Sequence, residues 1–81
     1  MLDRILEIYA DEELLTADVF DGAVIGIDEK SMRLIYSAEK CIEILIIDQL
    51  MTEEEAVEHF EYNVAGSYMG EKTPIWCYDI F

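Results

Sequence analysis

Glu55 and His59 are the pair of residues in this sequence whose types and spacing best suit acid–base chemistry or metal binding. They lie four residues apart in a segment with a helical pattern, so their side chains would share one helix face. A carboxylate beside an imidazole can move a proton, and both groups bind metal ions. His59 is the only histidine, and neither cysteine is near it in the sequence. Because zinc sites combine several such ligands, we expect a solvated helix face here rather than a metal centre.

Other sequence signatures of catalysis or cofactor binding are absent. The acidic runs Asp11-Glu12-Glu13 and Asp28-Glu29 lack the ligand spacing and the glycine of an EF-hand calcium loop. No GKS or GKT follows the glycines, and no GxSxG sequence occurs. The sequence therefore predicts a protein that is not an enzyme, with no cofactor and no bound metal.

The charge balance narrows the range of partners. The chain has 81 residues, with 19 acidic and 5 basic ones and a formal net charge of −14. Binding to phosphates requires Lys and Arg, so we expect no direct binding to nucleic acid and none to an anionic membrane. The N-terminal sequence is acidic and unlike a secretory signal, and Cys41 and Cys77 show no CxxC pattern. We therefore expect a cytoplasmic protein whose cysteines are reduced.

The pattern of apolar residues predicts one small α+β domain that spans residues 1–81. The strands are indicated by alternating and β-branched residues, a polar turn and Thr73-Pro74. The helices are indicated by helical spacing of apolar residues and by a capping box from Thr52 to Glu55. The expected fold is a small antiparallel sheet, made of a β-hairpin at about 23–36 and a C-terminal strand at about 75–80. Two or three helices pack against it, at about 2–10, 38–50 and 53–65.

Glutamates form a row along the outer face of the expected helix 53–65. Residues three or four apart on a helix place their side chains about 5–6 Å from one another, and B-DNA carries about one negative charge per 1.7 Å of its axis. An acidic helix can thus occupy a basic groove that normally holds nucleic acid; the alternative is that these acids only keep the protein soluble. The candidate partner-binding residues of this acidic face are Asp48, Glu53, Glu54, Glu55, Glu58 and Glu61.

The expected helix 38–50 is apolar around most of its circumference, which indicates burial on more than one side. In so short a chain, one of these sides could be a contact between subunits. Ile44 and Ile47 are the candidate residues for such self-association, which would produce a homodimer.

The stretch EYNVAGSYMGEKTPIW, at 61–76, combines two glycines, aromatic residues and the only proline. Most of it is explained by a helix that ends, a turn and the start of a strand. The other interpretation is a contact surface, because tyrosines are frequent anchors of interfaces. Its candidate residues are Tyr62, Asn63, Tyr68 and Glu71.

The same stretch resembles a group of small proteins encoded by bacteriophages and prophages. The similarity extends over about residues 20–76, and Ser67 and the segment 64–66 depart from the group's pattern. Its matching segments are Gly22–Gly26, Leu34–Tyr36, Met51–Ala56, Glu61–Asn63, Tyr68–Glu71 and Pro74-Ile75. The resemblance implies an accessory protein of a phage or mobile element, which acts in the cytosol of a bacterial host.

Three functional hypotheses follow from these observations. The first is a stoichiometric inhibitor of a host or defence protein, such as a CRISPR effector, that places its acidic face on a basic groove. The second is a homo-oligomeric structural or interaction module without a defence target. The third is a small ligand-binding or enzymatic domain around Tyr62, Asn63 and Glu71.

Overall fold

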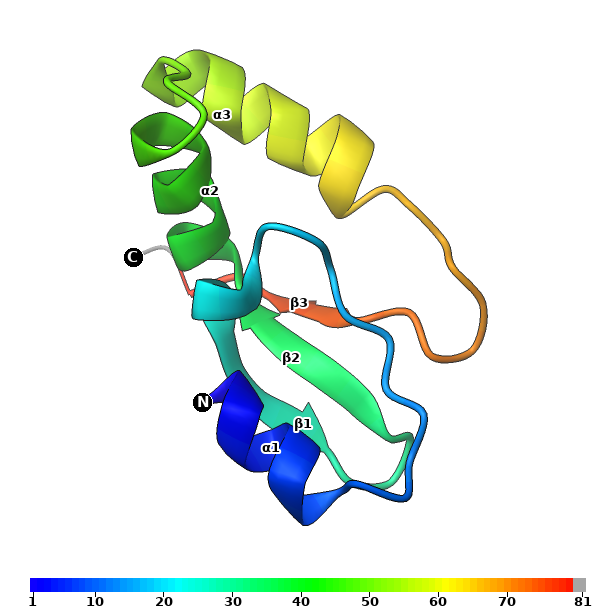
Figure 1. The fold of residues 1–81 in the computed structure, drawn as a ribbon. Coiled ribbons are helices and arrows are strands. Elements are labelled where there is room, and N and C mark those ends of the chain that lie inside the picture. Colours follow the sequence, from blue (N-terminus) through cyan, green and yellow to red (C-terminus); the bar gives the residue numbers. More distant parts are fainter. Residues whose placement is uncertain (80–81) are drawn as a thin grey trace.

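The computed structural model of the chain describes residues 1–79, which form an α+β fold, as predicted (Figure 1). A three-stranded sheet is combined with three α-helices, a short 3₁₀ helix and a π-helical turn. The elements, in chain order, are α1 (Leu2–Ile8), the 3₁₀ helix η1 (Asp21–Ala23), β1 (Val24–Asp28), β2 (Arg33–Ser37), α2 (Ala38–Ile47), α3 (Glu53–His59), the π-helix η2 (Phe60–Val64) and β3 (Ile75–Cys77).

The sheet is mixed, which corrects the expectation of a purely antiparallel one. The predicted hairpin is present, with β1 antiparallel to β2, but β3 runs parallel to β2 and pairs Ile35 with Ile75. A parallel pair needs a long crossover, and here α2, α3 and the loop 65–74 supply it (Figure 1). The last strand ends at Cys77 and not at Ile80, which lies outside the described residues.

Capping side chains set the starts of α2 and α3. The Ser37 hydroxyl accepts a hydrogen bond from the Lys40 backbone N–H, so α2 begins directly where β2 ends. The predicted capping box is present at α3. The N–H of Glu55 donates to Thr52 Oγ1 at 3.2 Å, and the N–H of Thr52 donates to Glu55 Oε1 at 2.9 Å. The helix α2 is shorter than predicted, because Leu50 adopts a left-handed φ of 56° that no helix can continue through.

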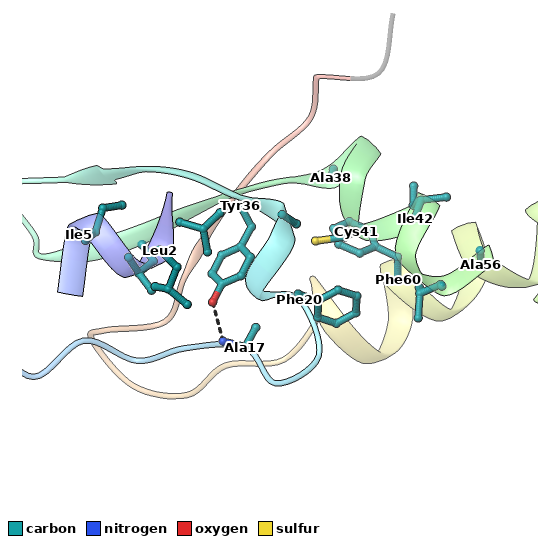
Figure 2. Close-up of a cluster of buried hydrophobic side chains, with 14 residues drawn as sticks. Leu2, Ile5, Ala17, Phe20, Tyr36, Ala38, Cys41, Ile42, Ala56 and Phe60 are labelled. Carbon is teal, nitrogen blue, oxygen red and sulfur yellow. Dashed lines mark hydrogen bonds between the residues drawn. The ribbon is translucent and has the colours of Figure 1, made fainter. Parts of the chain in front are cut away.

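Buried aromatic side chains join the helices to the sheet (Figure 2). Tyr36 of β2 and Phe60 at the end of α3 have no exposed surface. Trp76 of β3 packs against both rings, with centroids 5.2 Å from Tyr36 and 5.7 Å from Phe60. The backbone N–H of Ala17 donates a 2.7 Å hydrogen bond to the Tyr36 hydroxyl, which fastens the irregular segment before η1 to the sheet. With Phe60 held inside, the opposite face of α3 is turned to solvent.

Candidate protein-binding surface

The outer face of α3 carries the acidic row predicted from the sequence. Ala56 and Phe60 are fully buried, and helical geometry therefore places Glu54 and Glu58 on the opposite side, where both are exposed. Glu53, in the first turn, is exposed as well. The helix dipole favours the acids of the first turn, but this effect is limited to that turn and does not account for Glu58.

Hydrogen bonds separate the five candidate acids of α3 and η2 into two kinds. Glu55 belongs to the capping box, and the hydrogen bonds from Thr52 lower the pKa of its carboxyl group. Glu61 accepts a 3.1 Å hydrogen bond from the Tyr78 hydroxyl. Within residues 1–79, no side-chain hydrogen bond uses the carboxylates of Glu53, Glu54 or Glu58. These three charges are therefore available to a partner.

The basic residues of the chain do not compensate this charge. Residues 41–65 contain seven acids and neither Lys nor Arg. Three of the five basic residues lie at the other end of the molecule, in or near the hairpin. There Lys72 donates a hydrogen bond to the Ser31 carbonyl oxygen, and Lys30 and Arg33 lie beside Asp28. No Lys or Arg within residues 41–65 therefore offsets the acids of α3.

The motif Glu61-Tyr62-Asn63 lies in the π-helix η2. The N–H of Ala65 bonds to the carbonyl of Phe60, five residues back, at 2.8 Å. Such π-helical turns are rare, and those that occur inside helices are often found at functional sites. Tyr62 is left 78% exposed, and Asn63 Nδ2 lies 3.4 Å from His59 Nδ1.

An open hollow of about 480 Å³ connects the acidic face with this motif. The hollow therefore brings residues of the acidic face and of the motif Glu61-Tyr62-Asn63 together around His59. Glu55 and His59 share it, but no group of three potential metal ligands occurs in the described part of the chain. A shallow, open hollow on a helix exterior suits contact with another macromolecule. Its lining residues are Glu55, Glu58, His59, Tyr62 and Asn63.

The other candidate residues lie apart from this hollow. Tyr68 and Glu71 are exposed on the loop 65–74, and Asp48 is exposed at the end of α2. Ile47 is 69% exposed, as a self-association residue should be. Ile44, in contrast, is partly buried and packs against the core beside η1, so its side chain is largely used within the molecule.

Two features of this surface could not be found in the sequence, because they arise only when elements pack together. One is a groove between α2 and α3 that includes Glu39 and Glu43; their spacing of four residues on α2 was the only signal. The other is an apolar cleft of about 300 Å³, beside Asn63, between the loops and the end of the π-helix. Its apolar lining includes Phe20, Val64, Met69 and Trp76.

No helix within residues 1–79 has both the length and the apolar character needed to cross a membrane. A scan against protein-family models finds no match to the chain, and neither a search of curated proteins nor a search of solved structures finds one.

Proposed function

We propose that this protein acts by stoichiometric binding to another protein, and that the acidic outer face of α3 docks on a basic groove of that partner. One observation carries the proposal: Glu53, Glu54 and Glu58 are exposed, make no side-chain hydrogen bond within residues 1–79, and lie in a stretch without Lys or Arg. Solubility alone does not require four glutamates within the seven residues of α3, because the acids elsewhere on the surface already serve it.

The spacing of the charges suggests what normally fills such a groove. Side chains about 5–6 Å apart along a helix present a regular line of negative charge, as a nucleic-acid backbone does. A protein that binds nucleic acid through Lys and Arg would therefore attract this face. The resemblance to phage-encoded proteins makes a nucleic-acid-binding host or defence protein in the bacterial cytosol, such as a CRISPR effector, the partner of first choice.

A pull-down from nuclease-treated bacterial lysate, at low and at high salt, tests this proposal. The comparison is between the wild type, the charge-reversal variant Glu54→Lys/Glu58→Lys and the control variant Glu7→Lys/Glu13→Lys. The control changes the net charge equally but alters exposed acids outside α3. We expect the wild type and the control to retain one basic protein at low salt and release it at high salt. The α3 variant should bind it at least tenfold more weakly; unchanged binding would refute the acidic-face mechanism.

Self-association is the second candidate function, and the exposure of Ile47 and Leu50 at the end of α2 favours it. It predicts a solution mass of about twice 9.4 kDa. Sedimentation analysis of Ile47→Glu should then show the monomer. The control Ile8→Glu replaces an isoleucine of nearly equal exposure on α1 and should leave the dimer intact. A wild-type monomer at high concentration would exclude this function.

A further inference from the structure

A groove of about 200 Å³ runs between α2 and α3, beside the acidic outer face. Its floor is apolar and comes from both helices: Ile42 and Ile46 belong to α2, and Val57 to α3. Three exposed glutamates complete the lining and form its rim, Glu39 and Glu43 on α2 and Glu53 on α3. The groove thus combines an apolar base with carboxylates above it.

The rim charges are available to a partner. Within residues 1–79, the carboxylates of Glu39, Glu43 and Glu53 take part in no side-chain hydrogen bond; Glu39 is bonded only through its backbone N–H, to Asp79. Lys40 is the one basic residue of α2. It lies near Asp79, whose pKa is lowered mainly by the hydrogen bond from Ser37 and additionally by Lys40, and it does not line the groove. Within residues 1–79, no Lys or Arg therefore contributes to the groove lining.

The size and chemistry of the groove indicate which kind of side chain it can bind. Pockets for drug-sized ligands measure about 300–1,000 Å³, so this groove suits a single long side chain. Arg and Lys bury their aliphatic stems against apolar surface while the charged group stays at the edge. A guanidinium group offers five donors in a planar fork and is less strongly hydrated than an ammonium group, so it can bond carboxylates on two walls at once.

We propose that the α2–α3 groove binds one arginine side chain of the protein partner. The stem lies on Ile42, Ile46 and Val57, and the guanidinium group is held by the rim glutamates. This inference rests on the proposed function, since the acidic face of α3 continues into the groove through Glu53 and Val57, which line both surfaces. It assigns to the partner an arginine that projects from its basic groove.

The test is a methyl NMR titration of the whole chain with N-acetyl-arginine amide. Citrulline has nearly the same shape without the charge, so N-acetyl-citrulline amide serves as the control ligand. We expect saturable shifts of the Ile42, Ile46 and Val57 methyl signals with the arginine probe, and at least fivefold weaker binding of the citrulline probe. Absent shifts, or equal binding of the two probes, would overturn the inference.

Two matched variants locate the binding. Glu39→Gln/Glu43→Gln removes two groove charges on α2, and Glu54→Gln/Glu58→Gln removes two charges outside the groove. The first should raise the dissociation constant of the arginine probe at least fivefold, while the second should leave it within twofold. Equal effects would show general attraction to an acidic surface and contradict a groove. Circular dichroism melts establish that both variants are folded.

The result of the arginine titration can be distinguished from the result of the pull-down. If Glu54→Lys/Glu58→Lys abolishes capture of a basic protein while the arginine probe leaves the methyl signals unmoved, only the groove inference is wrong. If the probe binds in the groove but no basic protein is captured at low salt, the proposed function is wrong and the groove remains an arginine site without the partner we assign to it.

Discussion

The hydroxyl of Ser37 donates a 2.6 Å hydrogen bond to a carboxylate oxygen of Asp79, which follows it by 42 residues. The other oxygen of Asp79 accepts the backbone N–H of Glu39 at 3.1 Å, and Ser37 in turn caps α2 by accepting the N–H of Lys40. Asp79 therefore completes the N-terminal cap of α2 from the far end of the chain. It couples the helix that forms one wall of the groove to the strand β3.

Asp79→Asn should lower the melting temperature, and the loss should depend on pH. The hydrogen bonds from Ser37 and Glu39 lower the pKa of Asp79 below its ordinary value of 3.8. A carboxyl group with a lowered pKa in the folded state stabilises the fold above its unfolded pKa, and this contribution disappears as the pH falls through the folded pKa. The difference in melting temperature between the two proteins should be constant above about pH 4 and should shrink as the pH falls from there toward pH 2. The same difference in melting temperature at every pH would show that the charge of the Asp79 carboxylate does not contribute to stability.

Tyr36→Phe should reduce the free energy of unfolding by about 1–3 kcal/mol, because it leaves the buried N–H of Ala17 without an acceptor. Urea denaturation measures this loss. Tyr9→Phe is the control, since its hydroxyl bonds to Glu29 at the surface and its removal should matter much less. Equal losses in the two variants would mean that the Ala17–Tyr36 hydrogen bond does not hold the segment before η1.

Burial raises the pKa of Cys41 to about 12, whereas Cys77 is partly exposed; both are free thiols. Since the thiolate is the reactive form, Cys41 should be inert at pH 8 in the folded protein. Titration with a thiol reagent should modify one cysteine per chain at once and the second only in denaturant. Rapid modification of Cys41 in the native protein would show that the core around it opens.

The elements with strong local signals could be predicted from the sequence. Thr52 and Glu55 are three residues apart, and the capping box needs nothing beyond α3 itself. The direction of β3 could not be predicted, because it depends on the path of the loop 65–74 across the molecule. The π-helix was missed for a similar reason: a helical apolar stripe ending near Val64 fits an α-helix and a π-helix alike, and the packing of Phe60 against Trp76 is a tertiary contact.

The candidate surface also has one part that the sequence predicts and another part that only the packing of the helices creates. The row of Glu54 and Glu58 follows from helical spacing alone. The groove requires α2 and α3 to pack side by side, so Glu39 and Glu43 could not be assigned to it from their own sequence neighbourhood. Ile44 illustrates the converse: its apolar character predicted a contact between subunits, and its side chain packs within the molecule beside the 3₁₀ helix η1.

Gly66→Ala should destabilise the protein, because the added Cβ would crowd backbone atoms that cannot turn away as a side chain could. A Cβ at this position would lie 3.1 Å from the carbonyl oxygens of both Glu61 and Tyr62, in the backbone of the π-helix. Gly26→Ala is the control, because a Cβ there would meet nothing within 4 Å. Urea denaturation should show a loss for Gly66→Ala alone. If the two variants are equally stable, the π-helix does not depend on a glycine at its end.

Asp48→Lys should stabilise the protein and weaken its binding at the same time. Asp48 is the C-terminal cap of α2, where the helix dipole is negative and no basic residue lies in the last turn. A carboxylate at this end is unfavourable, and a lysine should raise the free energy of unfolding by about 0.3–1 kcal/mol. If Asp48 belongs to the partner surface, the same variant should bind the captured basic protein more weakly than Asp18→Lys, an exposed control in the segment before η1. Thermal melts and salt-dependent binding of the two variants check both effects. Equal binding would assign Asp48 to solubility and confine the partner surface to α3 and its groove.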